Sequence, residues 1–503
     1  MPVAKCATFT LWGLEALPVT VEVDVTPTEK PTLVIVGLPD SAVKESKDRV
    51  LTALKNCGYP LGAYHCTVNL APGHLRKEGS CYDLPIALGI IAATGQMPVS
   101  VLDNYFIAGE LSLNGDIRSI AGILPLVLLA QKKQAKGVLI PHSNSHEASA
   151  SSIDVFSCHS LKDVVAFLTL KGTLTKVPKV ENFAGDSLKP LVDMNSIKGQ
   201  ETAKRALEIA AAGGHNILFN GPPGSGKSML AKALPGILPP LSLSEALEVT
   251  QIHSVARLLE QSSSLLRHRP FRSPHHTTSY AGLVGGGSNP KPGEISLAHH
   301  GVLFLDELPE FSSSVLEALR QPLEDKSVTI SRARQQVTYP SQFICIAAMN
   351  PCPCGYYGHP SKACKDSEAQ RHRYTGKISG PLLDRFDIHI TVPPVSYKEM
   401  HESAENESSA IIRNRVQKAR LKQHSRQGEN KINATLTRSD LHLYCPLDNE
   451  CLQVIKMAME EHGVSARAAD RILRVGLTIA DLADENLNAL HLFEAFSYKC
   501  SII

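Results

Sequence analysis

The chain lacks a long uninterrupted apolar run. Its most apolar stretch, residues 84–102, contains two prolines and two glycines, so it falls short of the roughly 18 apolar residues in a row that a membrane-spanning helix requires. The first 25 residues hold one lysine and no apolar core ahead of a small-residue cleavage site, which argues against a secretory signal. We therefore expect a cytoplasmic protein without a membrane partner.

The chain also lacks an excess of charge of one sign. The 503 residues include 51 Lys and Arg against 49 Asp and Glu, a net charge of +2, which excludes a globally basic protein that coats nucleic acid. Any contact with nucleic acid must then come from local basic patches. Hydrophobic residues make up 43% and charged residues 20% of the chain, proportions that exclude a disordered, collagen-like or coiled-coil protein.

Cysteines are too few for a disulfide scaffold. The chain has 12, and we expect reduced thiols that are buried or metal-bound. Three of them fall close together, a spacing consistent with a small structural zinc site, and three unliganded thiols are the alternative. The candidate zinc ligands are Cys352, Cys354 and Cys364, with Asp366, His359 or His372 as the fourth.

The length predicts about three domains, at a prior of roughly 150 residues each. Residues 1–170 alternate strand-like and helical segments, which indicates a mixed α/β domain, and residues 171–193 form a linker rich in Gly, Pro and Lys. Residues 194–395 have the pattern of a doubly wound α/β core, and residues 396–503 are almost entirely helical.

A phosphate-binding loop opens the second domain. The sequence GPPGSGKS follows a strand-like run and precedes a helix, the context that the G-x-x-x-x-G-K-[ST] motif requires. Its lysine would reach the β- and γ-phosphate oxygens of ATP, and its serine would hold Mg²⁺. The predicted nucleotide-binding residues are Gly221, Pro222, Pro223, Gly224, Ser225, Gly226, Lys227 and Ser228.

Two further segments supply catalytic candidates. The apolar run at 302–305 ends in Asp306 and Glu307, of which the first would order Mg²⁺ and the second would polarise the attacking water, so ATP hydrolysis is expected. A second buried run ends in Asn350, an amide suited to orient that water.

Two arginines, Arg385 in the LLDRFD segment and Arg467 at the start of a C-terminal helix, are catalytic candidates as well. Taken singly, either could instead form a surface salt bridge.

Three local basic clusters could contact DNA: residues 267–276, an expected hairpin at 328–339, and residues 411–438. For the last cluster an ordinary solvated helix face is at least as good an interpretation. The candidate DNA-binding residues are Arg269, Arg272, Arg332 and Arg334.

These elements, in this order, resemble the Walker A, Walker B, sensor, arginine-finger and lid motifs of AAA+ ATPases. The long insert at 241–294 resembles that of the magnesium-chelatase/MCM group. Within it, the segments RPFRSPHH (269–276) and GGGSNPKPGE (285–294) resemble the YifB/ComM family of competence-linked, Mg-chelatase-like proteins.

The resemblance implies an ATP-driven homohexameric ring that translocates on single-stranded or branched DNA. Its expected role is branch migration during recombination of transforming DNA, with recombination proteins as partners. The resemblance further implies that Arg385 reaches the neighbouring subunit's γ-phosphate, that Arg467 contacts the nucleotide from the lid, and that the 328–339 hairpin projects into the pore.

The N-terminal domain resembles the Lon protease fold through segments 109–115, 121–122 and 138–141. Cys81 stands at or beside the position of the catalytic serine and Leu124 at that of the lysine, and leucine cannot serve as a base. We therefore expect a non-proteolytic scaffold or DNA-binding platform. The alternatives to a DNA motor are a chelatase-type or protein-remodelling ATPase and, disfavoured by Leu124, an ATP-dependent protease.

Overall fold

The computed structural model describes residues 2–179, 190–259, 265–287, 290–332, 335–359, 361–395, 406–429 and 431–499. The chain forms two compact units. The first comprises Met1–Ala184 together with Leu243–Leu266, and the second comprises Gly185–Ser242 together with Arg267–Ile503. Among the helices described, none is both long and apolar enough to cross a membrane.

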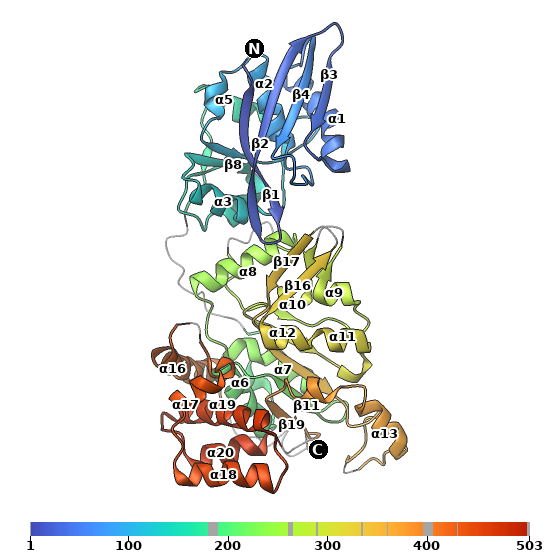
Figure 1. Ribbon diagram of the computed structural model, residues 1–503, viewed down its shortest axis with the longest axis vertical. Helices are drawn as coiled ribbons and strands as arrows, with labels where there is room; N and C mark the ends of the chain where they lie inside the picture. Colours follow the sequence, from blue (N-terminus) through green and yellow to red (C-terminus); the bar gives the residue numbers. More distant parts are fainter. Residues whose placement is uncertain are drawn as a thin grey trace. The chain divides into compact units, whose positions relative to one another are not determined.

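An eight-stranded mixed sheet forms the centre of the first unit, in the order β10-β9-β8-β5-β1-β2-β4-β3 (Figure 1). Four valines at alternate positions of β2 are buried, the period-2 pattern of a strand with one face on a core. Gly13, with φ +62, turns the chain between β1 and β2. The strands are β1 (Ala4–Trp12), β2 (Glu15–Pro27), β3 (Thr32–Val36), β4 (Tyr64–Ala71), β5 (Tyr105–Ile107), β8 (Gly137–Pro141), β9 (Val155–Cys158) and β10 (Thr175–Lys176), with a small hairpin of β6 (Glu110–Leu111) and β7 (Ile117–Arg118).

Helices pack against this sheet, and α2 is buried on every side. It contains the first part of the apolar stretch at 84–102, whose hydrophobicity therefore serves a protein core. The buried Asp83 at its start pairs with Arg49, with 2.9 Å between Oδ2 and Nε. The helices of the unit are α1 (Ser41–Cys57), α2 (Asp83–Ala93), α3 (Ile123–Lys132), α4 (Ser145–Ala148), α5 (Leu161–Leu168) and α8 (Leu243–Val255).

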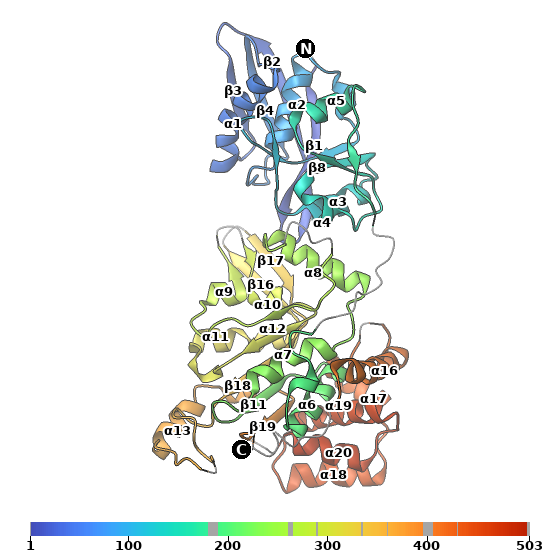
Figure 2. The ribbon, with the colours of Figure 1, turned by 180° about the vertical axis from the view of Figure 1, so that it is seen from behind.

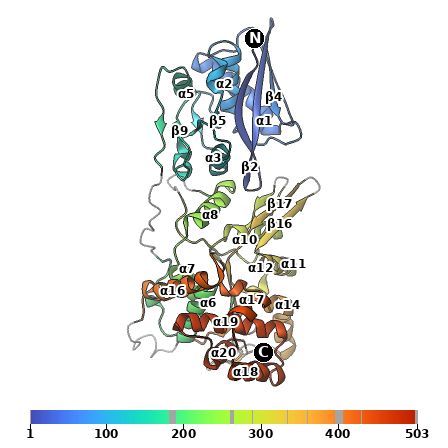
Figure 3. The same cartoon turned by 60° about the vertical axis from the view of Figure 1, so that its left-hand side comes forward.

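Helix α8 comes from the insert after the phosphate loop, yet it packs on α3 of the first unit (Figure 3). The Ser254 hydroxyl donates to the buried Glu147 carboxylate, which also accepts the Leu124 backbone N–H at 2.8 Å. Gln251 Nε2 donates to the Leu14 carbonyl oxygen at 2.5 Å. These contacts complete the first unit with residues that follow it by some 60 positions in the chain.

The second unit is built on a five-stranded, fully parallel sheet in the order β12-β15-β18-β11-β19. Every residue of β15 and β18 is buried, as expected for strands covered on both faces. Helices α6 and α7 pack on this sheet (Figure 2). The strands are β11 (Ile217–Asn220), β12 (Phe271–Arg272), β15 (Val302–Leu305), β18 (Ile344–Met349) and β19 (Ile388–Thr391).

Shorter elements surround the sheet of the second unit. The expected hairpin forms from β16 (Ser327–Arg332) and β17 (Gln335–Pro340), with Arg332 paired to Gln335. A second hairpin joins β13 (Gly285–Gly286) to β14 (Lys291–Pro292). The helices are α6 (Glu201–Gly213), α7 (Lys227–Ile237), α9 (Tyr280–Val284), α10 (Glu294–Leu297), α11 (Ser313–Ala318), α12 (Arg320–Asp325), α13 (Glu368–Thr375) and α14 (Gly380–Leu383).

The C-terminal segment is helical, as expected, and its helices share one hydrophobic core with the parallel sheet. Helices α16 and α19 both contact α6. Hence residues 194–242 and 267–395 lie in one compact unit with the C-terminal helices, and the predicted domain boundaries stay predictions. The helices are α16 (Ser409–Gln427), α17 (Arg438–Tyr444), α18 (Asn449–Glu460), α19 (Ala466–Ala483) and α20 (Ala489–Ser497).

Candidate nucleotide-binding site

The phosphate loop joins β11 to α7. Gly224 and Gly226 have φ of +79 and +89, a region open to glycine. A side chain at Gly221 would place Cβ 2.2 Å from the carbonyl oxygen of Val392, so only glycine fits there. The turn leads directly into the N-terminus of an 11-residue helix that begins at Lys227, and the first N–H groups of a helix favour a bound anion. All eight predicted loop residues, 221–228, lie in it.

Four predicted side chains meet at the carboxyl edge of the parallel sheet. Ser228 Oγ donates to Asp306 Oδ2 at 2.8 Å. Lys227 Nζ donates to two loop carbonyl oxygens, at 2.6 and 2.9 Å, and to Asn350 Oδ1 at 3.2 Å. Burial lowers the pKa of Lys227, and the nearby carboxylates of Asp306 and Glu307 offset this shift only in part. This set fits ATP and Mg²⁺, since Ser228 and Asp306 offer hard oxygen ligands beside a cationic amine.

Glu307 follows Asp306 with a φ of +52, a left-handed conformation that is uncommon for a residue with a side chain. Its backbone N–H donates to Asp306 Oδ1 at 3.0 Å. Its carboxylate lies 3.4 Å from His276 Nδ1, and the His276 ring contacts Phe311 edge-on. His276 belongs to the basic cluster predicted at residues 267–276, and no local motif predicts that it pairs with Glu307.

The two predicted arginines lie elsewhere. Arg385 and Arg467 both line a pocket of about 490 Å³, here called the arginine pocket. Its wall includes Asn216, which precedes β11, whereas the phosphate loop begins at Gly221, about 16 Å further along the strand. The pocket is lined by Gly214, Asn216, Leu323, Glu324, Lys326, Arg385, Asp387, Ala434, Thr435, Leu436, Thr437, Arg438, Arg467, Asp470, Arg471 and Arg474.

The arginine pocket carries six basic and three acidic side chains. Arg385 Nη2 donates to Glu324, and Arg385 Nη1 donates to the Pro381 carbonyl oxygen at 3.2 Å. Within the described part of the chain, Nε of Arg385 and Nε of Arg474 are buried without a hydrogen-bond acceptor. Since buried donors are ordinarily satisfied, the pocket is suited to an anionic group.

Two of the predicted DNA contacts are engaged inside the second unit. Arg272 forms a two-bond pair with Glu294, with N···O distances of 2.6 and 2.7 Å. Arg269 donates to the carbonyl oxygens of Pro239 and His300 at 2.6 and 2.7 Å. Their role as DNA contacts stays a prediction, and the structure supplies both with internal acceptors.

The hairpin and the third basic cluster differ from each other. Arg334 lies outside the described residues, and the side chain of Arg332 is not described. In residues 411–438, four arginines bond to acceptors within the second unit, as a structural helix face would. They are Arg413 with Gly236, Arg415 with Glu208 and Glu407, Arg420 with Ala211, and Arg426 with Asp481.

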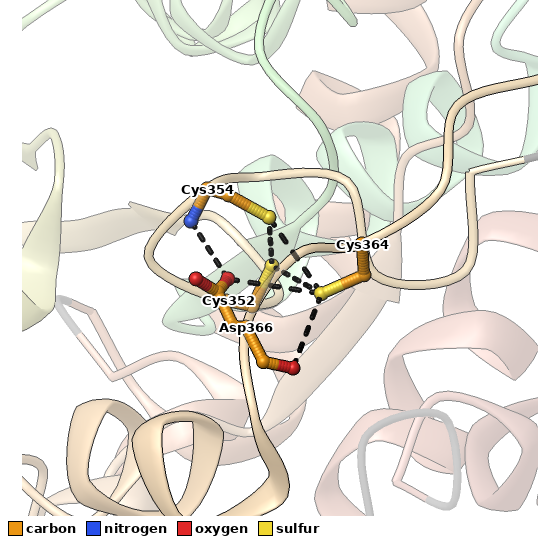
Figure 4. Close-up of side chains that lie close together, drawn as sticks. All are labelled: Cys352, Cys354, Cys364 and Asp366. Carbon is orange, nitrogen blue, oxygen red and sulfur yellow. Dashed lines mark hydrogen bonds between the residues drawn. The ribbon is translucent and has the colours of Figure 1, made fainter.

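The three clustered cysteines meet, together with Asp366 (Figure 4). His359 and His372 do not join them: His359 Nδ1 accepts N–H groups of its own turn, and His372 pairs with Glu368. The donor set of three thiols and one carboxylate could bind a metal.

The Lon-like site of the first unit holds no nucleophile–base pair at the predicted positions. Burial raises the pKa of the half-buried Cys81 thiol to about 12. Leu124 is fully buried in the first turn of α3. A thiol of that pKa is protonated at neutral pH, so it lacks the thiolate that a nucleophile needs.

Three family models match the chain. Magnesium chelatase, subunit ChlI, matches residues 193–400. The model of subunit ChlI of Mg-chelatase matches residues 21–144, and that of the C-terminal part of magnesium chelatase subunit ChlI matches residues 406–499.

Curated relatives match over nearly the full length. Competence protein ComM of Haemophilus influenzae is 44% identical over 498 residues, covering 97% of this chain and 96% of its own. Protein YifB of Salmonella typhimurium is 43% identical over 492 residues, covering 97% and 95%. Lon protease 2 of Bacillus subtilis is 32% identical over 114 residues, 23% of this chain and 20% of its own.

Proposed function

Because this chain belongs to the YifB/ComM family of Mg-chelatase-like AAA+ ATPases, we propose that it is an ATP-driven DNA motor. It acts as a helicase-type branch-migration factor in homologous recombination of transforming DNA. The observation that carries the proposal is the bonded set of Lys227, Ser228, Asp306 and Asn350 at the carboxyl edge of the sheet. The match to a competence protein supports DNA as the substrate.

The positions of these groups support hydrolysis of the nucleotide. Lys227 would stabilise charge on the β- and γ-phosphates, and Ser228 and Asp306 would hold Mg²⁺. Glu307 would take a proton from the attacking water, and Asn350, bonded to Lys227, would orient that water. His276 Nδ1 lies 3.4 Å from the Glu307 carboxylate, and this contact would compete with the attacking water for that carboxylate.

The arginine pocket supports assembly. Arg385 and Arg467 lie at the amino end of β11. They cannot reach a nucleotide that the same chain binds at the carboxyl end of that strand. We place both at the nucleotide of a neighbouring subunit, in a homohexameric ring. Arg467, predicted to contact the nucleotide from the lid, lines the same pocket as Arg385, and this position favours the neighbour's nucleotide for both. Hydrolysis would then depend on assembly.

DNA contacts are assigned to the tip of the β16–β17 hairpin, where Arg332 and Arg334 lie in the sequence. Contacts to the phosphate backbone of a DNA strand require flexible cationic side chains close to it. The first unit is assigned a non-proteolytic role, since Cys81 and Leu124 offer no catalytic pair.

The test is branch migration on a synthetic four-strand junction with ATP. Wild-type protein should move the junction, Lys227→Ala should not, and Lys232→Ala should behave as wild type because Lys232 is an exposed lysine of the same helix. ATP hydrolysis that proceeds without junction movement and without a response to DNA would overturn the proposal. That result would favour a chelatase-type or protein-remodelling ATPase.

A proteolytic role has a separate test. ATP-stimulated casein cleavage by wild-type protein that is lost in Cys81→Ala would establish a protease, and we expect no cleavage by either.

A further inference from the structure

The residues 352–366, here called the cysteine loop, begin two positions after Asn350. The sulfur atoms of Cys352, Cys354 and Cys364 lie 3.4, 3.6 and 3.6 Å from one another (Figure 4). Asp366 Oδ2 lies 3.7 Å from Cys364 Sγ. Four donor atoms from two short turns therefore surround one point.

These separations are those of a tetrahedral zinc site. Zinc–sulfur bonds of about 2.3 Å and zinc–oxygen bonds of about 2.0 Å place the sulfurs about 3.8 Å apart and sulfur and oxygen about 3.5 Å apart. A disulfide would instead bring two sulfurs to about 2.05 Å. Thiolates with one hard oxygen in a tetrahedron favour zinc over magnesium or calcium.

The backbone around the sulfurs and Asp366 also suits a metal. The Tyr357 N–H donates to Cys352 Sγ at 3.3 Å, and the Cys354 N–H donates to Asp366 Oδ2 at 2.9 Å. Arg371 Nη1 holds the Asp366 carbonyl oxygen at 3.3 Å. Hydrogen bonds of this kind fix the orientation of metal ligands and stabilise their anionic forms. Cys352 is fully buried, so one corner of the site is shielded from solvent.

The same loop touches the phosphate loop. Gly355 has a φ of +81, and a Cβ added there would lie 2.6 Å from Pro223 Cδ and 3.9 Å from Asn350 Cγ. Gly355 therefore packs directly against a nucleotide-binding residue and beside the sensor amide. Its own N–H donates to the Cys352 carbonyl oxygen at 3.0 Å, so its position follows that of a cysteine in the cluster.

We propose that Cys352, Cys354, Cys364 and Asp366 bind one Zn²⁺, and that the zinc holds the cysteine loop against Pro223 and Asn350 so that the phosphate loop keeps its nucleotide-binding form. The ion is structural, since the four protein ligands leave no open position. The coupling rests on the proposed nucleotide site, whereas the metal site does not.

The first experiment measures metal content of full-length protein purified without added zinc. Wild type should hold about one zinc per chain, and Cys364→Ser should hold little. Asp366→Cys should retain zinc against a chelator at least as well as wild type, and Asp366→Ala should lose it faster. Less than about half an equivalent in wild type, or iron in place of zinc, would overturn the metal site whatever the ATPase does.

The second experiment measures binding of a fluorescent ATP analogue to two glycine variants that keep all four ligands. Gly355→Ala should retain zinc but bind nucleotide about 10- to 100-fold more weakly, because its methyl group displaces Pro223. Gly358→Ala is the matched control: its φ of +75 imposes similar backbone strain, but among the described residues no atom beyond its chain neighbours lies within 4 Å of its added Cβ. It should bind nucleotide as wild type does.

Equal nucleotide binding by Gly355→Ala and Gly358→Ala would overturn the coupling. A second measurement needs no variant and so stays informative if Gly355→Ala misfolds. Chelator treatment of wild type should weaken nucleotide binding, and added zinc should restore it. Zinc loss without a change in nucleotide binding would also overturn the coupling. Lys227→Ala, which should lose nucleotide binding but keep zinc, separates failure of this inference from failure of the proposed function.

Discussion

The two ends of strand β11 are built in opposite ways. At the carboxyl end, the four predicted side chains form two pairs, Lys227 with Asn350 and Ser228 with Asp306. At the amino end, the arginine pocket has twice as many basic as acidic side chains, and two of its buried N–H groups find no acceptor among the described residues. The charged side chains of one end pair within the chain, whereas the basic excess of the other end suits an anionic group.

The largest expected effect comes from the amino end. Arg385→Ala should lower the rate of ATP hydrolysis by about 10³- to 10⁵-fold, the usual contribution of an arginine that acts on the transferred phosphate. Mixing Arg385→Ala with Lys227→Ala should restore part of the activity. Where the two variants are neighbours, the Arg385→Ala subunit supplies an intact Lys227 and the Lys227→Ala subunit supplies an intact Arg385 to the same nucleotide. A steady-state ATPase assay of the mixture, with each variant alone as control, measures this; a mixture as inactive as its parts contradicts action between subunits.

Removing the proposed general base, Glu307, should have the next largest effect. Glu307→Gln should slow hydrolysis about 10²- to 10⁴-fold and leave nucleotide binding intact, because the amide cannot accept the proton of the attacking water. Single-turnover hydrolysis together with equilibrium binding separates the two quantities. Equal loss of binding would mean that Glu307 shapes the site rather than the reaction.

A variant of Arg467 tests whether Arg467 and Arg385 act on the same nucleotide. Arg467→Ala should lower hydrolysis about 10- to 100-fold, less than Arg385→Ala, because its side chain is exposed. Mixed with Arg385→Ala it should not regain activity, since every interface then lacks one arginine. Recovery in the ATPase assay would place Arg467 at the nucleotide of its own subunit, and recovery on mixing with Lys227→Ala is the positive control.

The smallest expected effect concerns His276. His276→Ala should raise basal ATP hydrolysis about two- to fivefold, since a partly exposed polar contact restrains the Glu307 carboxylate only weakly. His275→Ala is the control, because the tilted His275 ring lies beside His276 but its Nδ1 bonds to Thr277 Oγ1. The measurement is the ATPase rate without DNA; a lower rate in His276→Ala would make the histidine a positioning group for the reaction.

The ease of prediction differs between these regions for a physical reason. The phosphate loop is local: eight consecutive residues with fixed glycines specify its shape, and Asp306 and Asn350 follow buried strands whose parallel order brings their ends together. The cysteine loop is local too, but the choice of Asp366 over His359 and His372 depends on turn geometry that spacing does not encode.

Long-range packing determines the contacts that the sequence does not predict. The partner of Glu307 comes from a segment some 30 residues earlier, and the arginines of the basic clusters find carbonyl and carboxylate acceptors that no motif specifies. The position of Arg467 depends on how the C-terminal helices share a core with α6. Helical periodicity predicts that such helices are amphipathic but not which partner they cover.

The membership of α8 in the first unit sets an order on synthesis. A nascent chain released up to residue 184 contains the whole eight-stranded sheet but not Ser254, so the buried Glu147 carboxylate would lack one of its donors. The first unit can be finished only after Leu266 leaves the ribosome, by which time the phosphate loop has emerged as well. Domains of most chains fold one after another from the N-terminus, whereas here the completion of the first waits for a segment that interrupts the second.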